Sequence, residues 1–203
     1  MPPKPKFTRE EVVEVALKLV SEKGMESLTA RELGERLGSS ARPIFTAFRN
    51  MEELTDAVRA AAMRKYDTYV GTALDYTPAF KRFGMQMVLF AAEEPNLFRL
   101  LFMRNNREQA NLSTLKTLLV PTRLLCLDAI AKDYQMSEKE AAAFFEHMWI
   151  FTYGLAVLCA TGMCQFSEEE LCTILGRQFM GAIGLMKSGR WDSRTPHPEI
   201  QNR

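Results

Sequence analysis

Residues 28–54, LTARELGERLGSSARPIFTAFRNMEEL, decide the fold of this chain. Thr29 is followed three residues later by a glutamate, which is the spacing of a capping box at the start of a helix. This first helix begins at about Thr29 and ends at Gly38, because glycine adopts the left-handed C-cap conformation without steric cost. Pro43 fits only in the first turn of a helix, so a second helix begins between Ser40 and Pro43. Two short helices around a tight Gly-Ser-Ser turn predict a helix-turn-helix.

The second helix of this motif has two different faces. Ile44, Ala47 and Phe48 are spaced so that they can pack inward together. The outward face carries four side chains, those of Arg42, Phe45, Thr46 and Arg49. These groups suit the major groove of DNA, where arginine binds guanine edges or phosphates and an aromatic edge meets a thymine methyl. A helical hairpin in an ordinary bundle, with a solvated arginine face, has the same spacing and stays open as an alternative.

Residues 8–56 resemble the N-terminal DNA-binding domain of the TetR/AcrR family of bacterial regulators. Order, spacing and length agree throughout this segment, and a chain of 203 residues is typical of the family. The matching residues are Val12, Ala16, Leu19, Val20, Gly24, Thr29, Leu33, Gly38, Ser39, Ile44, Phe45, Phe48, Glu53 and Leu54. The resemblance implies an all-α chain, with an N-terminal three-helix helix-turn-helix head and a larger helical-bundle domain for ligand binding and dimerisation.

The head departs from the family at two positions. The family usually has a tyrosine where this chain has Phe45, and a lysine where it has Met51. Both changes remove a group that binds phosphate, so contact with the DNA backbone must rest on other groups. The candidates are Arg49 and the exposed N–H groups that begin the fourth helix, where Asn50 and Glu53 are expected to form another capping box.

Charge in this chain is balanced, with a net value of +1 and 47% hydrophobic residues, as expected of a globular protein rather than a polycation. DNA affinity must therefore come from local groups. Residues 1–9 form a basic arm that can lie along the minor groove or a phosphate strand, and a leader without a role is an equal alternative. The expected DNA-binding residues are Lys6, Arg9, Thr29, Arg31, Ser39, Ser40, Ala41, Arg42, Pro43, Phe45, Thr46 and Arg49.

From Met51 onward the pattern is helical nearly everywhere, with Pro, Gly and polar clusters as breaks. The expected helices cover residues 51–73, 78–94, 95–103, 112–134 with a break or kink at Pro121, 137–161 and 167–187. We divide the chain into a DNA-binding domain at 1–56, a ligand-binding and dimerisation domain at 57–187, and a flexible tail at 188–203.

The last two helices each begin with a Ser-x-x-Glu capping box, at Ser137 and Ser167, and carry more apolar surface than a monomer exposes. In the family the equivalent pair forms a four-helix interface with a second chain, so we expect a homodimer through residues 137–161 and 167–187. Small residues that would allow close helix approach are Gly176, Gly181, Ala182 and Gly184. Burial inside one subunit is the alternative. Two-fold symmetry would suit a palindromic operator.

The body is rich in Phe and Met, which line adaptable apolar pockets. The family has its ligand cavity at the centre of this bundle, so we expect a small hydrophobic or aromatic effector. The candidate ligand-binding residues are Phe90, Phe98, Phe102, Met103, Phe144, His147, Met148 and Phe151. Most of them must also be ordinary core. His147 either orients a polar group of the ligand or is a buried histidine bonded to a backbone carbonyl.

Other functional classes find little support. The chain contains no Gly-rich phosphate loop, HExxH motif, nucleophile elbow or paired carboxylates on an apolar face, so we expect neither an enzyme nor a cofactor. Cys159, Cys164 and Cys172 fit no usual zinc spacing, and buried thiols are favoured over a metal site or a redox sensor. No signal peptide and no run of about 20 apolar residues is present, so we expect a cytoplasmic chain with reduced cysteines.

The sequence therefore predicts a ligand-responsive, TetR-like homodimeric regulator, a repressor that binds a palindromic operator and is released by a small hydrophobic molecule. The alternative is a helical small-molecule-binding or scaffold protein with little DNA affinity. Phe45, Met51 and the modest charge of the head favour this alternative.

Overall fold

The computed structural model describes residues 6–103 and 120–191, and both parts are helical. The α-helices are α1 (Arg9–Lys23), α2 (Ala30–Arg36), α3 (Arg42–Ala47), α4 (Met51–Gly71), α5 (Ala79–Glu93), α6 (Pro95–Phe102), α8 (Val120–Tyr134), α9 (Glu138–Ala160) and α10 (Glu168–Lys187). Two short 3-10 helices, η1 (Met25–Ser27) and η2 (Thr72–Asp75), follow α1 and α4. These two parts of the chain contain no strand, which confirms the expected all-α class.

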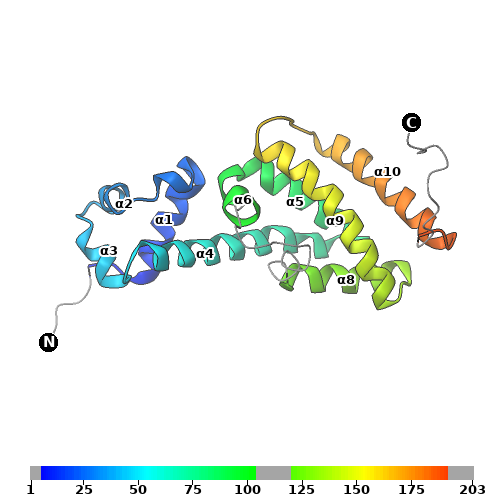
Figure 1. The fold of residues 1–203 in the computed structure, drawn as a ribbon, viewed down its shortest axis with the longest axis horizontal. Coiled ribbons are helices and arrows are strands. Elements are labelled where there is room, and N and C mark those ends of the chain that lie inside the picture. Colours follow the sequence, from blue (N-terminus) through cyan, green and yellow to red (C-terminus); the bar gives the residue numbers. More distant parts are fainter. Residues whose placement is uncertain (1–5, 104–119, 192–203) are drawn as a thin grey trace, which may run out of the picture.

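The molecule is elongated, with α1, α2 and α3 at one end and a bundle of α5, α6, α8, α9 and α10 at the other (Figure 1). Helix α4 joins the two ends: it packs against α1 in the head and against α5, α6 and α8 in the body. The expected boundary between residues 56 and 57 falls within this helix, so the division into domains stays a prediction. The expected stretch 112–119 and the tail 192–203 lie outside the described residues.

Side-chain caps fix where several helices begin. The Ser167 Oγ accepts the Glu170 N–H at 3.2 Å, and the Glu170 carboxylate accepts the Ser167 N–H at 2.8 Å. Ser137 and Glu140 exchange the same two bonds at the start of α9, at 3.4 and 2.9 Å. Both expected capping boxes are confirmed. These bonds favour the charged carboxylates, so the pKa values of Glu140 and Glu170 are lowered.

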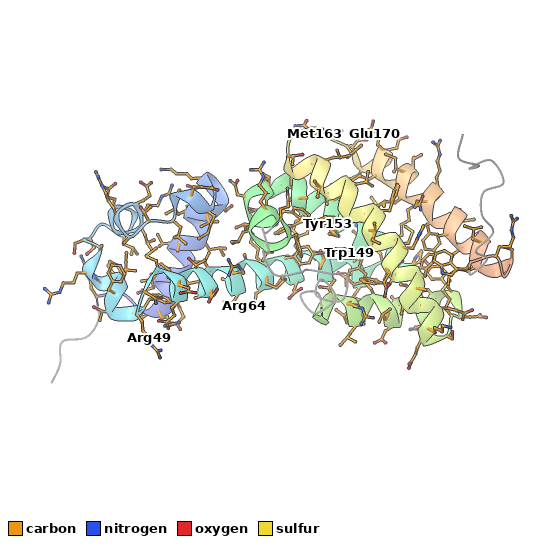
Figure 2. The ribbon with its side chains drawn as sticks, in the orientation of Figure 1. Arg49, Arg64, Trp149, Tyr153, Met163 and Glu170 are labelled. Carbon is orange, nitrogen blue, oxygen red and sulfur yellow. The ribbon has the colours of Figure 1, made fainter. Side chains whose placement is uncertain are left out.

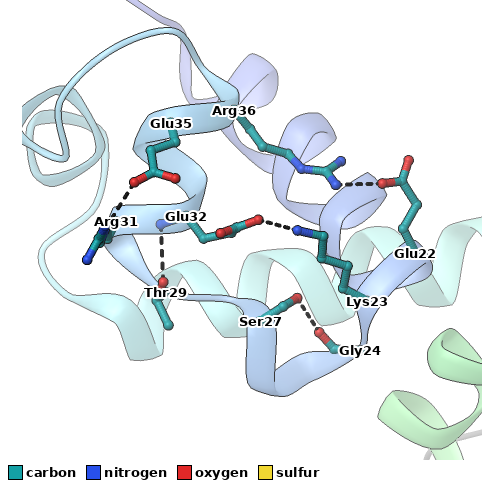
Figure 3. A network of polar contacts seen from close by, with 9 residues as sticks. All are labelled: Glu22, Lys23, Gly24, Ser27, Thr29, Arg31, Glu32, Glu35 and Arg36. Atoms are coloured by element: carbon teal, nitrogen blue, oxygen red, sulfur yellow. Dashed lines mark hydrogen bonds and ion pairs between the residues drawn. The ribbon is translucent and has the colours of Figure 1, made fainter.

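The expected capping box at α2 forms only in part (Figure 3). The Thr29 hydroxyl accepts the Glu32 N–H at 3.2 Å, as expected. The Glu32 carboxylate, however, binds the Lys23 ammonium of α1 at 2.5 Å instead of the Thr29 backbone. A charged donor makes a stronger hydrogen bond than a neutral amide, so this ion pair takes the carboxylate away from the cap. Its effect is to tie α2 to the end of α1.

The turn between α2 and α3 requires two glycines. Gly38 has φ +60°, the left-handed conformation expected of it, although α2 itself ends two residues earlier, at Arg36. Gly34 was not singled out by the sequence pattern, yet the turn packs directly on it. A β-carbon at Gly34 would lie 3.0 Å from the Ser40 carbonyl carbon and 3.1 Å from the Ala41 nitrogen. Both are backbone atoms that cannot move aside alone, so glycine is needed here for close approach.

The core runs from head to body without interruption. In the head, the fully buried side chains include those of Val12, Leu19, Leu33, Ile44, Leu54 and Val58. Phe48 is also buried, but it lies just beyond the end of α3 in extended backbone, not in the helix as expected. In the body, aromatic and aliphatic side chains of every helix contribute, with Phe90, Phe98, Ile130, Phe144 and Leu171 almost fully enclosed.

Helix α9 is the one described helix long and apolar enough, by composition, to cross a bilayer. The sequence analysis predicted no such segment, so this prediction is wrong for α9 by composition. Its position explains the composition, because α9 packs against α5, α8, α6 and α10 and buries nine side chains from Ala141 to Ala160.

We predict that Gly34→Ala destabilises the head by about 1–3 kcal/mol, the usual cost of overpacking a rigid contact. Helix propensity alone would favour alanine by about 0.5–1 kcal/mol, so a loss of stability identifies the contact with the turn as the cause. Thermal unfolding monitored by circular dichroism measures the effect. The matched control is Gly71→Ala, because a β-carbon there meets no atom within 4 Å. Equal stability of both variants would show that the turn does not rest on Gly34.

Candidate DNA-binding surface and ligand cavity

The outward face of α3 is open to solvent. Arg42, Phe45 and Thr46 are all exposed, and the Phe45 ring has 48% of its surface accessible. The Thr46 hydroxyl donates to the Arg42 carbonyl at 3.3 Å, so it can turn to another acceptor at little cost. Arg49 is exposed too and points away from the head (Figure 2). It lies beyond the end of α3, however, so its expected place on the same helical face is wrong.

Six other expected DNA-binding residues lie at α2, at the start of α3 or in the turn between these helices. Thr29, Arg31 and Ser40 are exposed, while Ser39, Ala41 and Pro43 are partly buried in the turn. Arg31 is paired with Glu35 at 3.0 Å, one turn along α2. The Lys6 ammonium donates to the Ser39 hydroxyl at 3.2 Å, so the described part of the basic arm lies beside the turn.

Arg9 is not a free group of the basic arm. Its Nη1 donates to the Ala47 carbonyl at 3.0 Å and lies 2.9 Å from the Glu53 carboxylate. The guanidinium also stacks over the Phe48 ring, 4.1 Å from its centroid. Arg9 therefore holds the end of α3 against α1 and α4. The sequence pattern missed this role, since the four residues are brought together only by the fold.

Glu53 completes this arrangement from the start of α4. The Asn50 side chain caps the helix by accepting the Glu53 N–H at 2.8 Å, as expected. The Glu53 carboxylate accepts the Arg49 N–H at 2.8 Å instead of the Asn50 N–H. The expected capping box therefore forms only in part, and the prediction of its second bond is wrong. The Arg49 N–H and the Arg9 guanidinium together hold the pKa of Glu53 below its usual value. The Arg49 N–H is thus occupied within the head.

This head is a known type. Residues 12–58 match the family of bacterial regulatory proteins named tetR. The N-terminal domain belongs to the TetR family. Over 58 residues the chain is 41% identical to the tetracycline repressor protein class C of Escherichia coli, a match that covers 29% of this chain and 26% of that protein. The chain therefore aligns with about a quarter of the length of this curated relative, in the DNA-binding head.

The whole fold also resembles solved structures. A proposed transcriptional regulator from Pseudomonas aeruginosa PAO1 has a TM-score of 0.64 and 13% identity, covering 92% of this chain and 96% of that one. A proposed TetR-family regulator from Mesorhizobium loti MAFF303099 has a TM-score of 0.60 and 14% identity, covering 87% and 95%. At these identities the likeness establishes the helical architecture, including the body beyond the TetR-family head.

A small cavity of about 40 Å³ lies inside the body, between α4, α5, α8 and α9. Its lining residues are Tyr66, Phe80, Phe83, Gly84, Met87, Thr122, Arg123, Cys126, Phe145, Met148, Trp149 and Thr152. The Thr122 hydroxyl donates to the Asp67 carboxylate of α4 at 2.8 Å. Burial raises the pKa of the Tyr66 hydroxyl and of the Cys126 thiol, so both line the cavity uncharged. Of the expected ligand-binding residues, Met148 is the one that lines this cavity.

Most of the other candidates belong to the aromatic core. Phe90, Phe98, Phe102 and Phe144 are buried, and Phe151 is partly buried. Phe90 and Phe102 pack edge-on against Tyr66, with ring centroids 5.2 and 4.9 Å apart. They therefore surround α4 beside the cavity. Met103 is 37% exposed, so its expected position at the centre of the bundle is wrong.

His147 also lies outside the core, contrary to expectation. Phe144, Met148 and Thr152 follow one another at four-residue spacing and form the buried stripe of α9, whereas His147 is turned about 100° from Met148. The His147 ring is exposed, 2.8 Å from the Gln178 side-chain nitrogen of α10, and packs edge-on against Trp191 at 5.1 Å. It joins α9 to α10 and is not among the residues that line the cavity.

The cysteines divide between core and surface. Cys126 and Cys159 are buried, and for Cys159 this confirms the favoured interpretation, whereas Cys164 is only partly buried. Cys172 is exposed, so that interpretation is wrong for it, and its Sγ lies 3.0 Å from the Lys81 ammonium of α5. Residues 6–103 and 120–191 contain no cluster of three or more side chains suited to bind a metal.

An apolar face remains uncovered on α9 and α10. Ile150, Met180 and Leu185 are 50%, 67% and 46% exposed. Beside them, Gly181 and Gly184 leave open space where a side chain would stand. Such a face allows another helix to approach closely.

We predict that Arg9→Met weakens DNA binding without changing its dependence on salt. Loss of the bond to Ala47 loosens α3, whereas a lost phosphate contact would lower the slope of log affinity against log salt by about one. Fluorescence anisotropy with a DNA duplex at several salt concentrations measures both. Arg49→Met is the control expected to lower the slope. A lower slope for Arg9→Met would mean that Arg9 leaves Glu53 to bind phosphate.

Proposed function

We propose that this chain is a homodimeric transcriptional repressor that binds a palindromic operator and is released by a small apolar ligand. The proposal includes a cytoplasmic location, where such a protein meets DNA. The observation that carries it is the open face of α3, with Arg42, Phe45 and Thr46 exposed on a head of the TetR family. A helix that served only to pack a bundle would have no need of an exposed phenylalanine ring on its outer face.

Dimerisation is supported by the uncovered apolar face on α9 and α10. An isologous contact between two such faces would bury Ile150, Met180 and Leu185 and bring glycines into close helix contact. Two heads related by two-fold symmetry would then read two half-sites about one helical turn of DNA apart.

Release by a ligand requires that the body move the head, and α4 is the element that can do so. Tyr66 and Asp67 of α4 contact the cavity region, while Leu54 and Val58 of the same helix belong to the head core. A ligand that displaced α8 from Asp67 would therefore shift α4 and, with it, α3. We expect an allosteric coupling of about 1–3 kcal/mol, equal in both directions between ligand and operator.

A second connection joins the head directly to α6. The Ser21 hydroxyl of α1 donates to Glu94 at 2.5 Å, and the Asn96 amide donates to the Ser21 carbonyl at 2.9 Å. Lys65 of α4 also binds Glu94. Movement of α6 would thus displace both α1 and α4, because both helices are bonded to the start of α6 around Glu94.

A gel shift against the region upstream of the gene tests the proposal. Specific retardation at nanomolar to micromolar protein supports it, whereas binding equal to that of unrelated DNA favours a helical binding or scaffold protein instead. Phe45 and Met51, where the family has phosphate-binding side chains, are the observations that favour this second function.

We predict that Arg42→Ala and Thr46→Ala each weaken specific operator binding by about 1–3 kcal/mol and relax the preference at particular base pairs. Both side chains are exposed, so the melting temperature should barely change. Footprinting and anisotropy against mutated operators measure the effect. Lys132→Ala is the control, since this exposed cation lies on α8 in the body, away from the head. Unaltered affinity and preference in both variants would exclude the α3 face.

We predict that Met180→Glu converts the dimer to a monomer and abolishes operator binding. Met180 is 67% exposed in one subunit, so the charge costs little until a second subunit removes its water. Sedimentation velocity at micromolar concentration reports the oligomeric state. Met163→Glu, at a side chain that is 74% exposed beyond the end of α9, is the control expected to stay dimeric. A monomeric wild-type chain would refute the interface before any variant is made.

A further inference from the structure

Two buried hydrogen-bond donors without an acceptor belong to side chains that line the cavity between α4, α5, α8 and α9. They are the Arg123 Nε of α8 and the Trp149 Nε1 of α9. Within the described ranges 6–103 and 120–191, neither atom has a hydrogen-bond partner, and neither is accessible to solvent. Buried donors in folded proteins are nearly always paired, so each of these calls for an explanation. That two of them share one cavity suggests a single missing acceptor.

The two threonine hydroxyls of the lining are already occupied. Thr122 donates to Asp67 at 2.8 Å, and Thr152 donates to the Met148 carbonyl at 2.8 Å. Among the described residues that line the cavity, none has a carboxylate side chain. The cavity wall therefore offers N–H donors and one permanent positive charge, the Arg123 guanidinium, against a background of aromatic and methionine side chains.

We propose that this cavity binds the effector and that the effector is an organic acid. Its carboxylate accepts hydrogen bonds from Arg123 Nε and Trp149 Nε1, and its apolar part lies among Phe80, Phe83 and Met87. A carboxylate satisfies both donors and the charge at once, which a neutral hydrocarbon or an amine cannot do. This inference rests on the proposed function and adds the chemical class of the ligand to it.

The size of the cavity sets a further condition. A volume of about 40 Å³ holds a few water molecules but is far below the several hundred Å³ that enclose a larger ligand. Binding must therefore widen the space. Met87 and Met148 can yield, because their unbranched side chains adopt many conformations. The wall formed by Thr122 and Arg123 adjoins Asp67 of α4, so widening acts on the helix that leads to the head.

Trp149 itself provides the readout. The chain has two tryptophans, so Trp191→Phe leaves Trp149 as the single emitter. We titrate this protein, without DNA, with octanoate, octan-1-ol and octylamine, which share one apolar body and differ in the head group. Octanoate is expected to change the Trp149 emission saturably and to bind at least tenfold more tightly than octan-1-ol, and octylamine is expected not to bind. Equal binding of octan-1-ol or octylamine, or no saturable binding of octanoate, overturns the proposal.

Arg123→Met in the same background tests the role of the guanidinium. It removes the charge and the unpaired donor while keeping a long side chain. The variant is expected to lose tenfold or more in octanoate affinity, to keep its affinity for octan-1-ol, and to melt at a higher temperature than the parent in the absence of ligand. A purely structural arginine would give the opposite: a lower melting temperature and unchanged octanoate affinity. Arg64→Met, an exposed site on α4 (Figure 2), is the control for loss of charge and should change none of these values.

Failure of this inference and failure of the proposed function give different results. If octanoate does not bind but the gel shift succeeds, the ligand class is wrong and the regulator stands. If octanoate binds as expected but leaves the operator complex intact, the carboxylate site is established and release by this ligand is refuted.

Discussion

The structure depends on the continuity of α4. Its 21 residues span about 30 Å at the rise of an α-helix, enough to belong to two cores at once. Leu54 and Val58 are enclosed by the head, whereas Tyr66 and Val70 are enclosed by the body. No glycine or proline interrupts the helix between these two sets. A rigid element that both cores hold cannot move in one without moving in the other, and this is the physical basis for expecting communication between cavity and α3.

Local signals in the sequence determined much of the fold correctly. The Ser-x-x-Glu pairs at Ser137 and Ser167 and the glycine at position 38 act within one turn of chain, so their spacing alone was sufficient. Most helix bounds follow from such signals to within two residues. The two half-formed capping boxes show the limit of this approach. The Glu32 carboxylate binds Lys23 of α1, and the Glu53 carboxylate binds the Arg49 N–H together with Arg9 of α1. The two partners on α1 lie more than a helical turn away in the sequence, so the spacing of the caps does not reveal them.

The candidate sites were less predictable, because they depend on which helices meet. Counting Phe and Met located the apolar body but could not separate the cavity wall from solid core, and Met148 was the one candidate that lines the cavity. Arg123 and Trp149 have no distinguishing neighbours in the sequence, and their unpaired donors become visible only when α8 and α9 pack together. His147 was misplaced for a simpler reason: the residues that flank it are apolar, but its own direction on α9 faces α10.

The brevity of α3 has a consequence for its dynamics. A helix of six residues is far too short to persist alone in water, so its order comes from Ile44, the turn seated on Gly34, and the Arg9 bond at Ala47. The free energy that protects the α3 amide protons from exchange with solvent therefore cannot exceed the stability of the packing between α1 and α4, which supports the helix. Any fluctuation that opens this support releases the whole helix at once. The proposed DNA-binding surface is thus the part of the head whose order is most readily changed. If it binds an operator as proposed, binding would protect the same amides more strongly from exchange.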